Sequence, residues 1–471
     1  MNNPVRNRRT DHVNDTVRSG MSRLENVMGD SMLKIRLMPS KVKIIFFLSA
    51  AVSLLFYMYL AHWLFQSDPE IHLESLLETD KCPACYGGSA CSMFYYKQIE
   101  FSGMSKFRTF DVMNTKNVHY GTLKPDGRQV VVKKLASDSE LKKMDERLCK
   151  DAKREPGCDI ARVITRTDMA LPLRDGPLVP EIMKKTGAFM FYCPSYRLID
   201  RVSTYFKEYK KKDQTMGSDK MHVLYSALVN PEVLLLQAFP KSEGWPFPEY
   251  LGSCGRAVVV ENAGRLLADF VDTSFHIRAG IAYELLKIAE KLTTKSDFVL
   301  YLTDVSYENF AVDSSGKVTV IDLENIIVVD KLAIQARKPK DWNEPHEGMF
   351  SECGGKNCLH IENDNLCTHL NSDHNYNAIC RNLLSKYAVE DRMPQGFLHD
   401  MPVEAEDYWD LGNLLEECAR PRQKEGRWKA KDKLLVALEA LKDGRREHLD
   451  VLHDKEKKES KHVLEKEVIG D

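Results

Sequence analysis

Three polar residues with the chemistry of a metal-assisted transfer site follow two short apolar stretches of the chain. Asp304 stands just after the run at 298–302, and Asn309 follows five residues later. Asp322 comes directly after a second run at 317–321, eighteen residues beyond Asp304. Both runs have the length and composition of short buried strands. The sequence therefore predicts two carboxylates and an amide held at strand ends.

This set of side chains suits phosphoryl transfer to a hydroxyl group. Such a reaction needs metal ions that bridge the phosphates and a carboxylate that orients the acceptor hydroxyl. Asp322 and Asn309 can supply oxygen ligands to Mg²⁺ or Mn²⁺, and Asp304 can act as the base. The alternative is that Asp304 and Asn309 only form a turn while Asp322 caps a strand. The intervals and the two strands together favour the transfer site.

The neighbouring sequence predicts the elements that would position this site. Two strand-like segments, VHYGTL and RQVVVKKL, flank the turn signal at 124–127 within residues 109–135. NPEVLLLQAF is helix-like, and AVVV at 257–260 is a short apolar strand. Five aliphatic residues at spacings of 4, 4, 3 and 4 predict the buried face of a helix: Ile277, Ile281, Leu285, Ile288 and Leu292.

The D-x-x-x-x-N motif and the Asp that follows it resemble the catalytic loop and the metal-binding Asp of protein kinases. The resemblance implies a strand Lys that holds the α- and β-phosphates of ATP, and VVVKK places Lys133 there, with Lys134 as the competitor. It also implies a helix Glu that pairs with this Lys. Glu232 in PEVLLLQAF fits that position, and Glu140 is the alternative because it lies closer to the Lys along the chain.

Four longer strings resemble the divergent protein kinase domain 2 family, the Golgi-associated "deleted in autism" type of protein: KCPACYG, GWPFPEYLGSCGR, LYLTDVSYENFAV and DHNYNAICRNLL. The likeness runs from about Lys81 to Arg420. It implies an α+β, two-lobed protein-kinase-like fold, a place in the secretory pathway and release from cells. It also implies an N-lobe insertion at about 136–220, an activation-loop position for 350–380, and Asp373 as a buried support of the catalytic loop.

Four departures from the kinase pattern leave two functions open. No G-x-G-x-x-G precedes Lys133, Leu302-Thr303 replaces His-Arg, Leu323-Glu324 replaces Phe-Gly, and no A-P-E follows. The first function is a kinase that uses ATP with Mg²⁺ or Mn²⁺ to phosphorylate a hydroxyl on a secreted protein or glycan. The second is a weak or inactive pseudokinase that acts as a binding or secreted signalling protein. Nucleotide binding is favoured, because the charged residues of the kinase pattern remain.

A hydrophobic segment predicts a membrane anchor ahead of this domain. Residues 44–65 are 22 consecutive positions without Asp, Glu, Lys or Arg, enough for a helix to cross a bilayer. Basic residues precede the segment, whereas 66–80 carries five acidic residues and no Lys or Arg. The positive-inside rule then predicts a type II single-pass protein whose C-terminal part lies in the lumen of the Golgi or ER.

All twelve cysteines follow the predicted anchor, which suits disulfides in an oxidising compartment, although the sequence leaves their connectivity open. Cys82-Pro-Ala-Cys85 lacks a fourth ligand for zinc, and Gly87-Gly88 do not suit a redox helix, so a structural disulfide is favoured. Four cysteines are expected to pin the activation-loop position: Cys353, Cys358, Cys367 and Cys380. Three histidines among them leave a metal site as an alternative: His360, His369 and His374.

These features divide the chain into five segments. They are a basic cytosolic tail (1–43), the anchor (44–65), a cysteine-containing lumenal stem (66–100), the kinase-like domain (101–421) and a charged helical tail (422–471). The net charge of -2 gives no reason to expect a nucleic-acid partner. The expected molecule is therefore a disulfide-rich, kinase-like domain carried by one transmembrane helix.

Overall fold

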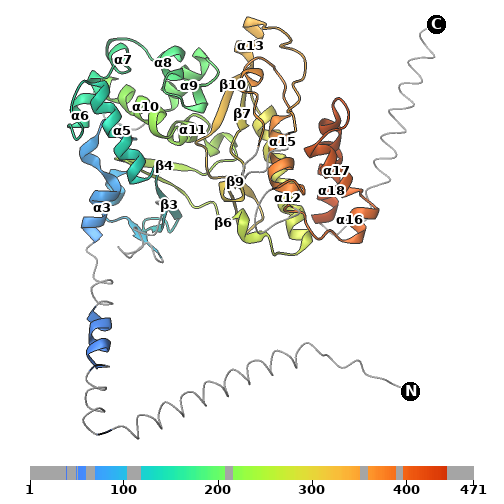
Figure 1. Ribbon diagram of the computed structural model, residues 1–471, viewed down its shortest axis with the longest axis horizontal. Coiled ribbons are helices and arrows are strands. Elements are labelled where there is room, and N and C mark those ends of the chain that lie inside the picture. Colours follow the sequence, from blue (N-terminus) through green and yellow to red (C-terminus); the bar gives the residue numbers. More distant parts are fainter. Residues whose placement is uncertain are drawn as a thin grey trace, which may run out of the picture. The chain divides into compact units, whose positions relative to one another are not determined.

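The computed structural model describes residues 39, 49, 51–59, 69–102, 118–206, 216–350, 359–388 and 396–442 of the chain. The chain divides into two compact units, one formed by 1–68 with 107–109 and the other by the remainder. In the first unit, residues 51–59 are helical. All the elements named below belong to the second unit (Figure 1).

The predicted anchor at 44–65 lies largely outside the described residues. Among the residues that are described, no single helix is long and apolar enough to span a membrane. One bent pair of helical segments, Asp219–Val229 and Glu232–Glu243, passes by length and composition alone. Most of the apolar side chains of this pair are buried in the core of the second unit.

The N-terminal lobe (N-lobe) is built on a five-stranded antiparallel sheet in the order β1-β2-β3-β5-β4. Its strands are β1 (Ile99–Phe101), β2 (Val118–Leu123), β3 (Gln129–Lys134), β4 (Tyr250–Cys254) and β5 (Ala257–Glu261). The predicted hairpin is confirmed, because β2 pairs with β3 and places Val118 opposite Lys133. Successive β-branched residues of β3 face opposite sides of the sheet, so Val130 and Val132 pack in one cluster and Val131 in another.

The segment predicted as a stem packs on this sheet. α3 (Pro69–Leu77), a 3₁₀ turn η1 (Thr79–Lys81) and α4 (Cys91–Tyr95) precede β1. Leu76 and Phe94 are buried in one cluster with Val130 and Val132. Since β1 pairs with β2, the packed domain begins well before residue 101. Burial of these apolar side chains against the sheet explains why the segment is not a free spacer.

The predicted insertion is helical and lies between β3 and α11 (Glu232–Ala238). Its elements are α5 (Asp138–Asp151), α6 (Ile160–Val163), η4 (Ile164–Arg166), α7 (Leu171–Asp175), α8 (Pro180–Lys184), η5 (Phe189–Phe191), α9 (Tyr196–Tyr205) and α10 (Met216–Val229). Figure 1 shows α5 to α9 gathered at one end of the unit and α15 to α18 at the other. The insertion therefore adds a helical layer beside the N-lobe.

The C-terminal lobe (C-lobe) contains the strands that were predicted to carry the site. β7 (Phe298–Leu302) pairs with β10 (Ile326–Asp330), while β6 (Arg265–Leu266), β8 (Phe310–Val312) and β9 (Val318–Val320) form a second small sheet. Of the short helices, η7 (Leu267–Phe270) follows β6 and η8 (Tyr307–Asn309) lies between β7 and β8. Two more follow β10, α13 (Lys331–Arg337) and α14 (Asn363–Leu366), and η6 (Lys241–Glu243) precedes β4 of the N-lobe sheet. In α12 (Phe275–Thr294), four residues of the predicted apolar face are buried, but Ile277 in the first turn is 50% exposed.

The C-lobe ends in a helical bundle. α15 (His374–Ile379) continues as a π-helix, η9 (Cys380–Leu384), and is followed by α16 (Val403–Asp407), α17 (Leu411–Ala419) and α18 (Gly426–Lys442). α18 packs on α12 and α17, and Leu434, Leu438 and Leu441 are buried. The first part of the predicted tail at 422–471 is thus part of the packed domain, and residues beyond 442 lie outside the described residues.

Five disulfides join ten of the twelve cysteines: Cys82–Cys85, Cys91–Cys254, Cys149–Cys158, Cys193–Cys367 and Cys380–Cys418. The expectation of a disulfide-rich domain is confirmed. Two of the bonds fasten the end of the activation-loop position, through Cys367 and Cys380. Cys353 and Cys358 lie outside the described residues.

Candidate active site

A buried ion pair joins β3 to α11. The Nζ atom of Lys133 donates to Oε1 of Glu232 at 3.1 Å and to the carbonyl of Ile321 at 2.5 Å. The side chain of Glu232 is 2% exposed and that of Lys133 is 15% exposed. Burial raises the pKa of the Glu232 carboxyl, and the charge of Lys133 opposes that rise. The two residues singled out in the sequence are therefore brought together at a point where charge is poorly solvated.

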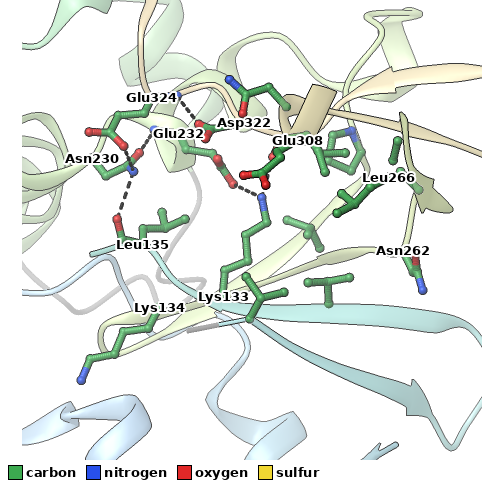
Figure 2. Close-up of a pocket in the computed structure, with 18 of the residues that line it drawn as sticks. Lys133, Lys134, Leu135, Asn230, Glu232, Asn262, Leu266, Glu308, Asp322 and Glu324 are labelled. Carbon is green, nitrogen blue, oxygen red and sulfur yellow. Dashed lines mark hydrogen bonds and ion pairs between the residues drawn. The ribbon is translucent and has the colours of Figure 1, made fainter. Parts of the chain in front are cut away.

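The competing residues have other partners. Lys134 faces the opposite side of the sheet, where its ammonium group donates to the carbonyl of Ser75 and to Asp138 (Figure 2). Glu140 closes a capping box at the start of α5: its carboxylate accepts from the backbone of Ser137, whose hydroxyl accepts from the backbone of Glu140. Geometry thus selects Lys133 and Glu232 from the alternatives that the sequence left open.

The predicted C-lobe residues approach the same place. Asn309 donates from Nδ2 to the backbone carbonyl of Asp304 at 3.2 Å, which closes the loop after β7. Asp322 follows β9 and accepts the backbone N–H of Glu324 at 3.2 Å. Burial raises the pKa of the Asp304 carboxyl, and the nearby charge of Asp322 raises it further. The backbone N–H of Leu323 also donates to Glu232 at 3.4 Å, so the segment of Asp322 lies directly beside the ion pair.

A cavity of about 630 Å³ collects these groups between the lobes. Lys133, Glu232, Asn309 and Asp322 line it together with other polar side chains, such as Glu261 and Glu308. Aliphatic residues also line it: Val118, Val131, Val260, Leu266, Ala311 and Ile321. Figure 2 shows Lys133 extending toward Glu232 while Asp322 and Glu308 lie nearby. A hollow in which aliphatic walls meet convergent charged side chains can bind a cofactor that has both an apolar ring and charged groups.

Sequence reasoning noted Glu324 as a departure from the kinase pattern and missed Asn230, and both residues line this cavity. Asn230 donates from Nδ2 to Glu324 and to the carbonyl of Leu135, both at 3.1 Å, and its Oδ1 accepts the backbone N–H of Glu232 at 2.9 Å. Burial and the surrounding carboxylates raise the pKa of Glu324 to about 7. The Asn-Pro-Glu start of α11 was the available signal for Asn230, because Asn commonly precedes a helix.

The donor set fits a divalent cation. No group of three or more His, Cys, Asp or Glu side chains in the described part of the chain is arranged to hold a metal ion. However, the Oδ1 atom of Asp304 is buried without a hydrogen-bond partner in that part. Asp322 and Asn309 add carboxylate and amide oxygens, which Mg²⁺ and Mn²⁺ accept as ligands. A cation here would offset the mutual repulsion that raises the pKa of Asp304.

The start of α15 supports the catalytic-loop position. The residues that do so are His374 and Asn375, so the expectation that Asp373 supports this loop was wrong. The ring of His374 donates from Nε2 to the carbonyl of Leu302 at 2.8 Å. Asn375 accepts the backbone N–H of Leu302 and donates to the carbonyl of Leu300, both at 3.0 Å. Asp373 is buried, but it accepts from the backbone of Gly348 at 2.7 Å and from Arg427 at 2.5 Å. It therefore supports the chain entering the activation-loop position.

The histidine metal site left open by the sequence is not assembled within the described residues. His374 is committed to Leu302, and the ring of His369 donates to the carbonyl of Asn365 at 2.8 Å. Burial lowers the pKa of His374 to about 4, so this ring is neutral near neutral pH. The residues ahead of Lys133 that depart from the glycine-rich pattern fall mainly in 103–117, outside the described residues.

Comparison with known proteins decides the family. Residues 224–421 match the family described as the protein-kinase domain of FAM69. Divergent protein kinase domain 2A of Xenopus tropicalis is 39% identical over 79% of this chain and 89% of its own length. The chain belongs to the divergent protein kinase domain 2 family. The human 2A protein is 39% identical over 78% of this chain and 87% of its own length, and the mouse 2B protein 30% identical over 55% and 61%.

This divergent protein kinase domain 2 protein therefore has a kinase-like domain of mixed α and β structure. Among solved structures, the Rv3197–erythromycin complex from Mycobacterium tuberculosis covers 86% of this chain and 95% of its own, at 14% identity and a TM-score of 0.24. A likeness this weak supports no argument about the site. The arrangement of Lys133, Glu232, Asp304, Asn309 and Asp322 is what bears on function.

Proposed function

We propose that this chain is a lumenal kinase-like enzyme of the secretory pathway that binds ATP with Mg²⁺ or Mn²⁺ and phosphorylates a hydroxyl on a secreted protein or glycan. The observation that carries the proposal is the convergence of the Lys133–Glu232 pair with Asn309 and Asp322 on one cavity of about 630 Å³. Asn309 also donates to the backbone carbonyl of Asp304, which ties the loop of Asp304 to this cavity. Membership of a family named for divergent kinase domains supports the same reaction class.

Each residue has one task in this proposal. Lys133, held by Glu232, binds the α- and β-phosphates, and Asp322 with Asn309 would hold the divalent cation. The cation, when bound, neutralises phosphate charge during transfer. Asp304 orients the acceptor hydroxyl and accepts its proton, for which the raised pKa of its carboxyl is suitable. The aliphatic wall formed by residues such as Val131 and Leu266 would contact the adenine ring.

A pseudokinase is the second candidate, and Glu324 favours it. This carboxyl lies two residues beyond Asp322 and lines the same cavity. When it is ionised it adds negative charge where a triphosphate would sit, and burial already raises its pKa to about 7. In that case the domain would bind a partner in the lumen or after secretion.

Thermal unfolding of the full chain with and without ATP and Mn²⁺ tests nucleotide binding. A ligand at 100 times its Kd stabilises the fold by about 2.7 kcal/mol, which raises Tm by a few degrees. The shift should vanish in Asp322→Ala and persist in Asp269→Asn, a control at an exposed carboxylate. No shift with any divalent cation would contradict the proposal and favour the pseudokinase.

Phosphotransfer is tested separately with Asp304→Ala. This variant should keep the ATP-dependent Tm shift but lose transfer of labelled phosphate to secretory-pathway proteins or glycans. Equal product from wild type and variant would exclude Asp304 as the base. Retained binding with no transfer by the wild-type chain would leave a nucleotide-binding pseudokinase.

The Golgi or ER location and the type II topology belong to the same proposal. The five disulfides support an oxidising compartment. An N-glycosylation acceptor introduced into the turn at 313–316, between β8 and β9, should be glycosylated in cells if the domain lies in the lumen. The same acceptor placed before residue 43 should remain unmodified. The opposite pattern would contradict the topology.

A further inference from the structure

The disulfide between Cys82 and Cys85 is unevenly buried. Its Cα atoms lie 4.9 Å apart, with only Pro83 and Ala84 between the two cysteines. Cys85 is completely buried, whereas Cys82 is partly exposed. An attacking thiolate must approach a sulfur atom directly, so burial of Cys85 leaves Cys82 as the side of the pair that faces solvent.

A buried imidazole lies against the inner sulfur. The Nδ1 atom of His222 is 3.0 Å from the carbonyl oxygen of Cys85 and 3.5 Å from its Sγ atom. A carbonyl only accepts hydrogen bonds, so Nδ1 carries a proton and donates it to Cys85. His222 is 1% exposed, and burial lowers its pKa, which keeps the ring neutral. The ring therefore offers an N–H donor within reach of Sγ without placing a full charge there.

The bond contributes little to holding its segment in place. A disulfide stabilises a fold more when it closes a longer loop, and this one closes the shortest of the five described loops. The same segment is held independently by backbone hydrogen bonds from Tyr86 to Gly255 at 2.9 Å and from Gly255 to Gly87 at 2.8 Å. The Cys91–Cys254 disulfide ties the following residues to β4. Opening the Cys82–Cys85 bond would leave these ties intact.

We propose that Cys82 and Cys85 form a thiol–disulfide exchange site that acts on cysteine thiols, either of a polypeptide or of glutathione. The thiolate of the substrate attacks Sγ of Cys82, the Cys82–Cys85 bond breaks, and its electron pair leaves on Cys85. The N–H of His222 stabilises the Cys85 thiolate. A second substrate thiolate attacks the substrate sulfur of the mixed disulfide, which releases the oxidised substrate and the Cys82 thiolate. Two substrate thiols are oxidised to one disulfide, and the protein pair is reduced and takes up two protons.

This inference does not depend on the proposed kinase-like function, because none of the three residues lines the 630 Å³ cavity. It also gives the CPAC string a chemistry that the sequence alone did not favour. The sequence argument against a redox role was that Gly87-Gly88 follow the string where a redox site has a helix. In the structure, the donor that usually comes from a helix N-terminus is supplied by His222 of α10.

The first experiment equilibrates the full chain with defined ratios of reduced and oxidised glutathione, followed by alkylation and mass spectrometry. Cys82 and Cys85 should become alkylated at ratios where the Cys149–Cys158 pair stays oxidised. That pair is the matched control, since it is also local in sequence, with a separation of 9, and has a buried cysteine. Equal resistance of both pairs up to unfolding would overturn the proposal.

The second experiment traps the intermediate. In Cys85→Ser, the Cys82 thiolate should attack oxidised glutathione or the disulfide of an oxidised two-cysteine peptide, which forms a mixed disulfide and releases the other sulfur as a thiol. The faster partner identifies the source of the substrate thiol. No adduct with either would contradict the proposal. The glutathione titration of the wild-type chain decides the question even if this variant fails to fold.

The role of His222 as a positioning residue has its own measurement. His222→Leu should slow reduction of the Cys82–Cys85 pair by about tenfold, because the leaving thiolate loses its donor. His222→Asn should restore part of the rate, since its amide nitrogen can occupy the place of Nδ1. Unchanged rates of reduction in both variants would exclude the role.

Discussion

At the scale of single residues, the site depends on one cation among several carboxylates. Within the described part of the chain, Lys133 is the only basic residue whose side chain forms an ion pair with Glu232. Burial raises the pKa values of the Glu232, Asp304 and Glu324 carboxyls, and the nearby charge of Asp322 raises each of them further. Removing the ammonium group of Lys133 should therefore affect the stability of the fold as well as nucleotide binding.

The first prediction concerns Lys133→Met. Loss of the ammonium group leaves Glu232 buried without its partner, so the free energy of unfolding should fall by about 3 kcal/mol at pH 7.5. Adding Glu232→Gln should recover most of that loss, because the unpaired charge is gone, while the ATP-dependent Tm shift stays absent. Urea unfolding measures both variants. A double variant no more stable than the single one would contradict the pairing.

The second prediction concerns His374 and pH. Its pKa is about 4 in the folded chain against about 6.5 when unfolded, so the ring must be neutral to stay buried. The stability that the neutral ring contributes is complete above pH 6.5 and is lost as pH falls toward 4. At pH 5 the loss of unfolding free energy is about 2 kcal/mol. In His374→Gln, the drop in unfolding free energy between pH 7.5 and 5 should shrink by that amount. An unchanged drop would refute this origin, and exposed His360→Gln is the control.

At the scale of secondary-structure elements, one helix holds the loop that carries Asp304. The first residues of α15 satisfy the backbone of β7 from the side, and farther along Asn382 donates to the carbonyl of Val305 at 3.3 Å. Tyr307 in turn donates to the carbonyl of Leu383 at 2.6 Å. The loop is thus fixed on both sides by a helix that follows it by about seventy residues.

Asn375→Ala tests this support. The substitution leaves the N–H of Leu302 and the carbonyl of Leu300 buried without partners, so unfolding free energy should fall by about 3 kcal/mol. Hydrogen exchange should show lost protection at the amide of Leu302. Asn377→Ala in the same helix is the matched control, since the side-chain amide of Asn377 is buried with no hydrogen-bond partner among the described residues. Equal effects of the two substitutions would contradict the role of Asn375.

Local sequence patterns predicted the secondary-structure elements well, but they predicted fewer of the contacts between these elements. The hairpin of β2 and β3 follows from two strand-like segments around a turn signal, and the strands before Asp304 and Asp322 follow from short apolar runs. Selecting Lys133 over Lys134 required the sheet, because adjacent strand residues face opposite sides. The supports from His374 and Asn375 could not be read from the chain, since they depend on how a distant helix meets β7. Ile277 kept the helical spacing yet lies in the first turn of α12, where little packs on it.

At the scale of the whole domain, the insertion joins the two lobes. Ser195 donates from its hydroxyl to Asp330 of β10 at 2.7 Å, and Arg201 of α9 donates to the carbonyl of Ala238 at the end of α11 at 2.6 Å. The Cys193–Cys367 disulfide lies at the same junction. Sequence could not predict this pairing, because twelve cysteines allow many connectivities and these two are 174 residues apart.

The fourth prediction compares two disulfides. Replacing Cys193 and Cys367 by Ala opens a long loop, for which the loss of chain entropy in the unfolded state predicts a cost of about 5 kcal/mol. The same double replacement at Cys149 and Cys158 opens a short loop and should cost about 3 kcal/mol. Guanidinium unfolding of both variants measures the difference. A larger loss of unfolding free energy on removal of the Cys149–Cys158 disulfide would show that the Cys193–Cys367 disulfide adds little to stability.

The bridge from Ala238 through α9 to Asp330 also bears on timing. In enzymes with two lobes, opening of the cleft often sets the rate at which products leave. Hydrogen bonds and a disulfide that join the insertion to both lobes would restrict opening of the cleft, so a bound nucleotide would have a long residence time. Turnover would then begin with a burst of one product per molecule and continue at the rate of exit. An assay that reads only steady-state product would understate the chemistry of such a molecule.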